Sequence, residues 1–210
     1  MFEAAMCRTS FELPSKPLLI VLSGPSGAGK DAVLHRMKGT ACPVACIVTT
    51  TTRPKREYEN DRIDYDFVSR KKFQEMLKKD EFLEWAQVYG NWYGLPKEAV
   101  RSALDSGQDV IVKVDTQGAA TIKRKVPQAV FIFLIPPTLE ELVTRLKERH
   151  TESAEEFALR TKMASEEIKS LPMFDYIVVN RQGRLDLAVA EIKAIITAEK
   201  CRVNQGEIKL

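Results

Sequence analysis

The feature that most constrains this chain is a glycine-rich segment, Gly24-Pro-Ser-Gly-Ala-Gly-Lys30, which follows directly on a short apolar run. The run, residues 18–22 (LLIVL), is typical of a strand that is buried on both faces. After the segment, apolar side chains have helical spacing: Ala32, Val33, Leu34 and Met37. A buried strand that turns tightly into a helix favours a fold in which helices cover a sheet.

The rest of the chain repeats this alternation. Four more apolar runs predict strands, at residues 44–48, 110–114, 130–135 and 176–179. Helical patterns occupy most of the gaps, at residues 116–125, 139–149, 155–170 and 185–201. Strands that alternate with helices indicate a parallel sheet with helices on both faces, an α/β fold.

Residues 53–92 break the alternation. They are rich in charged and aromatic side chains and contain no long apolar run. This composition predicts a small lobe inserted into the sheet domain, with an exposed face able to hold a ligand. A surface insertion that only packs on the core is the alternative interpretation.

Composition limits the possible partners and compartments. With 210 residues, 32 Lys and Arg against 29 Asp and Glu, and a net charge of +3, the chain lacks the broad basic surface of a nonspecific nucleic-acid binder. Its four cysteines form no CxxC pair, which predicts reduced thiols rather than a disulfide or zinc role. No run of 18 apolar residues and no signal-peptide pattern occur, so we expect a cytoplasmic protein without a membrane span.

The glycine-rich segment fits G-x-x-x-x-G-K in the strand-to-helix context that this motif requires. Its glycines let backbone N–H groups surround phosphate oxygens, and Lys30 would reach the outer phosphates of a nucleotide. A turn that merely joins strand to helix is the alternative. The motif continues with Ser or Thr as a magnesium ligand, but this chain has Asp31, a carboxylate that can also ligate the metal directly or through water.

Beyond this segment, residues 18–196 resemble the guanylate kinases. The resemblance is carried by separated motifs: Thr51-Thr-Arg53 with Arg56 and Glu59, Tyr65-Asp-Phe67, Glu84-Trp-Ala, Gly90-Asn-Trp-Tyr93-Gly94, Asp115-x-Gln117-Gly118, Arg145 with Arg149 and Arg160, and Val179-Asn180. It implies a P-loop NTPase-type parallel sheet, a GMP-binding lobe and a helical lid. The implied single domain spans 17–207, with core segments 17–52, 94–144 and 171–207, lobe 53–93, lid 145–170 and an N-terminal extension 1–16.

The resemblance also implies an activity, the transfer of the γ-phosphoryl group of ATP to GMP with Mg²⁺, in purine metabolism. The implied ATP-binding residues are Gly24, Pro25, Ser26, Gly27, Ala28, Gly29, Lys30, Asp31 and Asn180. Those implied for GMP are Thr49, Arg53, Arg56, Tyr65, Glu84, Tyr93 and Asp115. Catalysis would rest on Lys30, Arg145, Arg149 and Arg160, with Asp31 as a metal ligand. We expect a monomer or homodimer that acts on small molecules, with neither nucleic acid nor membrane as a partner.

These residue types suit such chemistry. Arginine forks can hold a phosphate dianion bidentately, and tyrosine hydroxyls can donate to it. An ionised Glu84 would accept from both N1–H and the 2-amino group of guanine, a pair that adenine cannot offer. Taken singly, each arginine could be a surface ion pair and Glu84 a solvated acid.

The chain departs from the family pattern at several positions. Asp31 replaces a hydroxyl residue, Lys113 replaces the first Asp of a D-x-D, and Leu95 replaces the Ser or Thr that bonds the guanine carbonyl. Tyr58 and Arg62 stand where the family has glycines. We hypothesise that Asp31 and Lys113 are a charge swap in which the two side chains face each other, and that Leu95 weakens the preference for GMP over AMP.

Two other functions stay open from the sequence. Ribose 1,5-bisphosphate kinases share the fold and can carry Asp after the loop lysine, although Glu84 and the Thr-Thr-Arg segment favour GMP. Guanylate-kinase-like interaction modules typically lose the loop lysine and lid arginines, all of which this chain retains.

Overall fold

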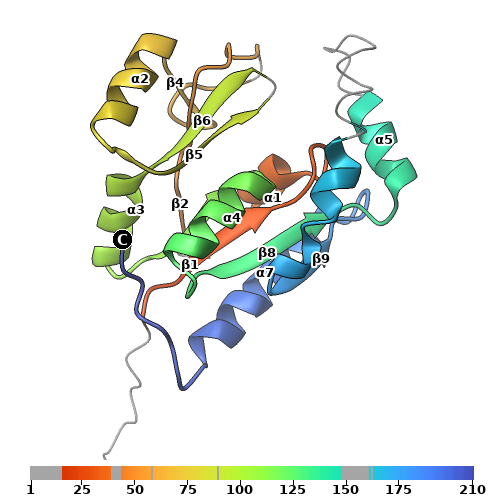
Figure 1. Ribbon diagram of the computed structural model, residues 1–210. Helices are drawn as coiled ribbons and strands as arrows, with labels where there is room; N and C mark the ends of the chain where they lie inside the picture. Colours follow the sequence, from red (N-terminus) through yellow and green to blue (C-terminus); the bar gives the residue numbers. More distant parts are fainter. Residues whose placement is uncertain (1–15, 39–43, 58, 89, 148–160, 162) are drawn as a thin grey trace, which may run out of the picture.

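The computed structural model describes residues 16–38, 44–57, 59–88, 90–147, 161 and 163–210. Five parallel strands form its central sheet in the order β2-β7-β1-β8-β9 (Figure 1). Their bounds are β1 Leu19–Ser23, β2 Val44–Cys46, β7 Asp109–Lys113, β8 Val130–Ile135 and β9 Tyr176–Val179. The predicted α/β fold with a parallel sheet is therefore confirmed, and each apolar run contains one strand.

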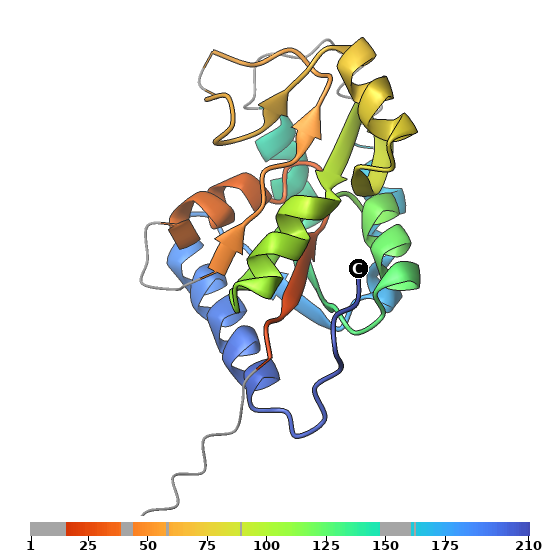
Figure 2. The same ribbon diagram turned by 90° about the vertical axis from the view of Figure 1, so that its left-hand side faces the viewer.

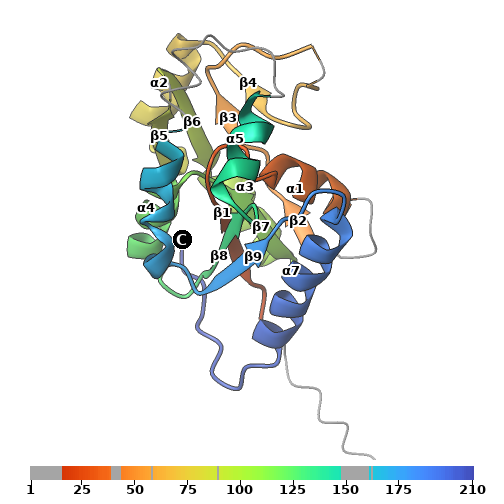
Figure 3. The ribbon, with the colours of Figure 1, turned by 90° about the vertical axis from the view of Figure 1, so that its right-hand side faces the viewer.

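Helices cover both faces of this sheet, and β1 is therefore buried on both sides (Figure 3). Alternate side chains of a strand point to opposite faces. Ile20 and Leu22 pack with α1 (Lys30–Lys38) and α7 (Leu185–Lys200). Leu19 and Val21 pack with α3 (Lys97–Asp105) and α4 (Thr116–Lys125). The result is a three-layer arrangement with β1 in the middle of the core.

A second sheet stands beyond the carboxyl end of the first (Figure 2). It has the order β4-β3-β6-β5, with bounds β3 Thr50–Thr51, β4 Asp66–Phe67, β5 Phe82–Val88 and β6 Asn91–Pro96. Helix α2 (Arg70–Lys78) packs on it through Phe73, whose ring stacks on that of Phe82 at 4.6 Å between centroids. The sheet runs from Thr50 to Pro96, slightly outside the expected lobe limits of 53–93.

Helices α2 and α3 were not predicted from apolar periodicity. Helix α2 buries one side chain, Phe73, and α3 buries two, Val100 and Leu104. Both helices lie in or directly after the charged, aromatic-rich segment 53–92, for which the sequence predicted a lobe without assigning its helices.

The remaining elements connect β8 to β9. Helix α5 (Leu139–Lys147), the helical residues 163–168 and the 3₁₀ turn η1 (Leu171–Met173) lead to β9. Leu142 and Leu146 of α5 form a small cluster with Ala164. Much of the expected lid, with Arg149 and Arg160, lies outside the described residues. No helix in the described part of the chain combines the length and apolar character needed to cross a membrane.

Candidate active site

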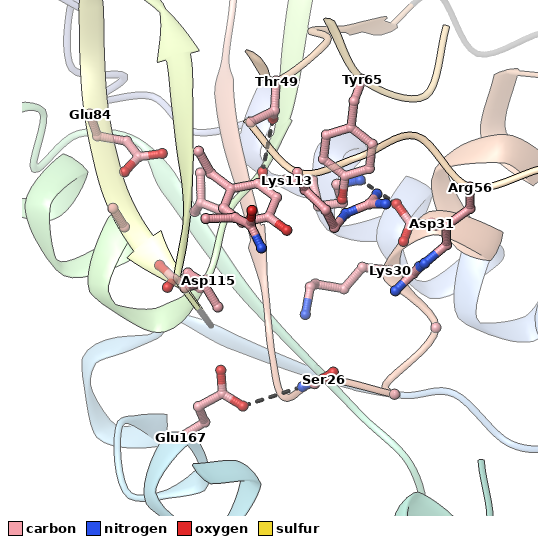
Figure 4. Close-up of a pocket in the computed structure, with 18 of the residues that line it drawn as sticks. Ser26, Lys30, Asp31, Thr49, Arg56, Tyr65, Glu84, Lys113, Asp115 and Glu167 are labelled. Atoms are coloured by element: carbon pink, nitrogen blue, oxygen red, sulfur yellow. Dashed lines mark hydrogen bonds and ion pairs between the residues drawn. The ribbon is translucent and has the colours of Figure 1, made fainter. Parts of the chain in front are cut away.

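A cavity of about 540 Å³ separates the carboxyl edge of the central sheet from the second sheet (Figure 4). Ligands of open α/β folds bind at this edge. The cavity lining includes most of the residues expected to bind nucleotides: Ser26, Gly27, Gly29, Lys30, Asp31, Thr49, Arg53, Arg56, Tyr65, Glu84, Tyr93 and Asp115. The fold therefore brings side chains from widely separated segments to one space.

The glycine-rich loop joins β1 to α1 at one end of the cavity. Gly24 has a φ of +139°, and a Cβ there would lie 2.0 Å from the carbonyl oxygen of Leu134, so no other residue fits. Lys30 Nζ donates to the Pro25 carbonyl at 3.1 Å and to the Gly24 carbonyl. Burial lowers the pKa of Lys30. The lysine is thus held inside its own loop, beside the space that nucleotide phosphates would enter.

Two side chains that are distant in the sequence, those of Asn180 and Arg145, form hydrogen bonds to this loop from outside the cavity. Asn180 Nδ2 donates to the Ala28 carbonyl at 2.8 Å, and Arg145 donates to the Asn180 carbonyl at 2.7 Å and to the Ala28 carbonyl at 3.4 Å. Neither Asn180 nor Arg145 is among the residues that line the cavity. In this structure both contact the loop rather than the cavity space.

Glu167 also contacts the loop, although no motif in the sequence indicates this contact. The Ser26 backbone N–H donates to Glu167 Oε2 at 3.2 Å (Figure 4). Glu167 belongs to the helical residues 163–168, and in the sequence it is one acid within a highly charged stretch. A carboxylate thereby accepts from one of the loop amides expected to bind phosphate.

An arginine pair lies on the second-sheet side. Glu59, which is 6% exposed, accepts from Arg53 Nη2 at 2.7 Å and from the Arg56 backbone N–H at 2.8 Å. Burial opposes the negative charge of Glu59, but these donors outweigh it and lower its pKa. Glu59 therefore fixes both arginines at the cavity wall.

Aromatic side chains adjoin the arginine pair. The rings of Tyr65 and Tyr93 lie 6.0 Å apart between centroids, and the Arg53 guanidinium lies 5.3 Å from the Tyr65 ring. Thr49 Oγ1 donates to the Lys113 carbonyl at 3.4 Å. Hydroxyl and guanidinium donors thus gather in one part of the cavity.

Asp31 and Lys113 form an ion pair across the cavity wall (Figure 4). Burial opposes the charge of Lys113, but Tyr65 and Asp31 outweigh it and raise the lysine pKa. The hypothesis that these two side chains face each other is confirmed. Lys113 ends β7, and Asp31 lies in the first turn of α1, the helix that follows the loop.

A buried carboxylate, Glu84 on β5, lies at the far end of the cavity. Its side chain is nearly inaccessible, and Oε2 has no hydrogen-bond partner among the described residues. Burial, and secondarily the charge of Asp115, raise the Glu84 pKa to about 8. Gly118 makes room for Glu84, because a Cβ at residue 118 would lie 2.7 Å from Oε2. Asp115 is held by the Gly118 N–H at 2.7 Å.

Comparison with known proteins identifies the family. The guanylate kinase family model matches residues 16–199. The chain belongs to the guanylate kinase family. A guanylate kinase of Caldanaerobacter subterraneus subsp. tengcongensis is 45% identical over 90% of this chain and 91% of its own length. A chloroplastic and mitochondrial guanylate kinase 2 of Oryza sativa is 41% identical over 94% of this chain and 70% of its own length.

A solved structure agrees with this assignment. The crystal structure of a guanylate kinase from Anaplasma phagocytophilum covers 92% of this chain and 91% of its own, with a TM-score of 0.75 and 28% identity. These relatives favour neither the ribose bisphosphate kinases nor a non-catalytic module. The comparisons therefore place the chain with guanylate kinases over nearly its whole length.

Leu95 departs from the guanylate kinase pattern in a way that the structure explains. It lies across the strand pair from Glu84 and is fully buried in the core cluster with Leu83 and Val100. Leu95 therefore adds to the core beneath the site, at a position where the family pattern has a hydrogen-bonding side chain.

Proposed function

We propose that this protein transfers the γ-phosphoryl group of ATP to GMP, giving ADP and GDP. The observation that carries the proposal is Glu84, a buried carboxylate with an unpartnered oxygen that lines the same cavity as Lys30. An unpartnered buried acceptor is costly unless a ligand supplies donors. Guanine offers two adjacent donors, N1–H and the 2-amino group, which match one ionised carboxylate.

The remaining groups divide the cavity between two substrates. We assign the GMP phosphate to Arg53, Arg56, Tyr65, Tyr93 and Thr49, with Asp115 beside the base. The ATP phosphates are assigned to the loop residues 24–31, whose backbone N–H groups, Pro25 apart, can donate to them. Because both sets line one cavity, the two phosphoryl ends would meet between them.

Phosphoryl transfer asks the protein mainly for alignment and for positive charge around the transferred oxygens. We assign this charge to Lys30 and to the lid arginines Arg145, Arg149 and Arg160. Lys30 already lies against the loop, and its lowered pKa reflects burial that incoming phosphates would offset. Arg145 contacts Ala28, so it reaches the same loop from outside the cavity lining.

Magnesium is the cofactor that we infer. Proteins usually hold Mg²⁺ through one or two carboxylates together with substrate phosphates and water. Asp31 lines the cavity next to Lys30 and its side chain is 64% exposed, so its oxygens fit that donor set. The bound ion would supply neutralisation of the phosphate oxygens, and Asp31 would be its protein ligand.

We also infer a place in cytoplasmic purine nucleotide metabolism, with a monomer or homodimer as the working form. Small-molecule substrates suit a net charge of only +3, with the cavity lined locally by Lys30, Arg53, Lys55, Arg56 and Lys113. Cys46 and Cys201 are thiols rather than disulfides in the described part of the chain, which suits a reducing compartment.

An assay of ADP formation from ATP tests the function. GMP, AMP and ribose 1,5-bisphosphate are supplied separately with Mg²⁺. We expect turnover with GMP, at least about tenfold less with AMP because it cannot satisfy Glu84, and none with the sugar bisphosphate. Lys30→Met is the inactive control. ADP formation with ribose bisphosphate alone, or an unchanged GMP preference in Glu84→Ala, would contradict the proposal.

A further inference from the structure

Lys113 is a positive side chain that the guanylate kinase pattern does not place in the cavity. It ends β7, pairs in register with Leu22 just before the glycine-rich loop, and lines the cavity with 11% of its side chain exposed. A fixed, buried cation therefore stands between the loop and the arginine pair.

The neighbours of Lys113 are residues that we assign to the binding of GMP, the phosphoryl acceptor. Lys113 Nζ lies 4.0 Å from the centroid of the Tyr65 ring, and the Tyr65 hydroxyl is a hydrogen-bond partner of the lysine. Tyr65 also contacts Arg53 and lies near Tyr93. Lys113 thus adjoins the group of hydroxyl and guanidinium donors that we assign to the GMP phosphate.

The two side chains of the Asp31–Lys113 pair differ in burial. Asp31 is 64% exposed at the open side of the cavity, whereas Lys113 is 11% exposed and packed against Tyr65. An ion pair with one exposed member is weak and easily exchanged. A phosphate monoester carries a charge near −2, so it can outcompete a single carboxylate for the same ammonium.

We propose that Lys113 is a ligand of the GMP phosphate, and that in the nucleotide-free protein Asp31 occupies the position this phosphate takes. Binding of GMP exchanges one anionic partner of Lys113 for another, and no covalent bond changes. This assignment rests on the proposed function, because it presumes that GMP is the acceptor. It differs from a static charge swap, in which Lys113 would only neutralise Asp31.

The two interpretations predict different changes in the affinity for GMP when Asp31 is replaced by Asn. If Asp31 competes with the phosphate, its removal tightens GMP binding, because Lys113 no longer has to give up a partner. If the pair is static and the phosphate binds elsewhere, Asp31→Asn changes the affinity for GMP only through the overall charge of the cavity, and the same change occurs when Lys113 is absent. The phosphate-free nucleoside serves as an internal reference.

The experiment measures dissociation constants of GMP and guanosine by isothermal titration calorimetry, without ATP or Mg²⁺. We expect Lys113→Met to weaken GMP about 10- to 100-fold, the usual value of a charge-assisted hydrogen bond, and to leave guanosine within about twofold. Asp31→Asn should tighten GMP several-fold. Lys38→Met is the matched control, since Lys38 Nζ donates to the Ile63 carbonyl at 3.2 Å, outside the cavity lining.

A double-mutant cycle separates direct competition from a general field effect. In the Lys113→Met background, Asp31→Asn should no longer tighten GMP. Lys113→Arg should recover most of the lost affinity, and in turnover Lys113→Met should raise KM for GMP with KM for ATP nearly unchanged. Thermal unfolding of each variant establishes that it is folded.

Distinct outcomes would overturn the proposal. GMP affinity of Lys113→Met within twofold of the wild type would do so, as would an equal loss for guanosine. If Asp31→Asn still tightened GMP binding in the Lys113→Met background, the effect would come from the overall charge of the cavity alone and not from competition for Lys113. A wild-type protein that neither binds GMP nor forms ADP from it would instead refute the proposed function.

Discussion

At the residue scale, two residues are held in unfavourable states. Glu84 is a buried carboxyl whose missing partner a ligand would supply, and Arg62 has a backbone conformation that favours glycine. Glu84 is held with its pKa raised to about 8 and with Oε2 unpartnered among the described residues. Arg62 has a φ of +59°, in the region that favours glycine. The guanylate kinase pattern has glycine at position 62, so the strain follows from a replacement visible in the sequence.

Guanosine binding should depend on pH through Glu84. The carboxyl is mostly protonated below its pKa of about 8, and only the ionised form accepts both guanine donors. Affinity for guanosine should therefore rise with pH, by about tenfold between pH 6 and pH 7, and level off above pH 8. Calorimetry with the nucleoside avoids titration of the GMP phosphate.

Glu84→Gln is the control for this profile, because its amide does not titrate. It should bind guanosine weakly and with little pH dependence. A wild-type affinity that is flat from pH 6 to pH 8 would contradict a titrating Glu84.

Replacing Arg62 by glycine should stabilise the fold. A left-handed conformation costs an ordinary residue about 1 kcal/mol, and part of the gain is lost to the greater freedom of glycine in the unfolded chain. We expect an increase of about 0.5 kcal/mol in the free energy of unfolding, measured with urea. Gln74→Gly, at an exposed position in the middle of α2, should instead destabilise by about 1 kcal/mol. A loss of stability in Arg62→Gly would show that the Arg62 side chain contributes more than its backbone costs.

At the element scale, the site depends on how close α4 approaches β5. The N-cap of α4 is Asp115, which accepts a hydrogen bond from the Gly118 N–H. In the same turn Gly118, which has no side chain, lies against the Glu84 carboxyl. The capping of α4 and the placement of the Glu84 carboxyl are thereby joined in one turn. The Asp-x-Gln-Gly motif is explained by this contact rather than by any conformational need of glycine.

Gly118→Ala tests this close approach. The new Cβ would lie 2.7 Å from Glu84 Oε2 and 2.9 Å from its Cδ, so the carboxylate must move. We expect KM for GMP to rise by about tenfold or more, the scale of one lost hydrogen bond to a charged group, with KM for ATP nearly constant. Thr121→Ala on the same helix is the control and should leave both constants unchanged. Equal increases in both KM values would point to a general disturbance of α4.

At the scale of the whole molecule, segments far apart in the chain meet at the loop between β1 and α1. Asn180, which follows β9, and Arg145 of α5 both reach the Ala28 carbonyl. Residues of the second sheet face the same loop across the cavity. The phosphate end of the site therefore depends on the correct assembly of the complete sheet.

Asn180→Ala should loosen this assembly. It removes the 2.8 Å bond to Ala28 and leaves a buried carbonyl less well satisfied, at a cost of about 1–3 kcal/mol in the free energy of unfolding. ATP binding should weaken, while guanosine binding at Glu84 should stay near the wild-type value. Urea unfolding and calorimetry with each ligand measure the two effects. Unchanged ATP affinity in a destabilised variant would restrict Asn180 to a structural role.

Much of the fold was predictable because it depends on local properties of the chain. A buried strand needs a continuous apolar run, and a turn such as that at Gly24 needs glycine, so both are visible in short windows of sequence. The second sheet was less visible. Its strands β3 and β4 have two residues each, too short for an alternation to be recognised.

The sequence by itself determined the central sheet, the phosphate-binding loop and the family motifs, since each is written in neighbouring residues. Only the tertiary structure decided which of these residues touch. Asp31 meets Lys113 across 82 positions, and Ser26 meets Glu167 across 141. Such contacts arise from the packing of whole elements, and the energy that selects them is spread over the buried core rather than located at the contacting residues.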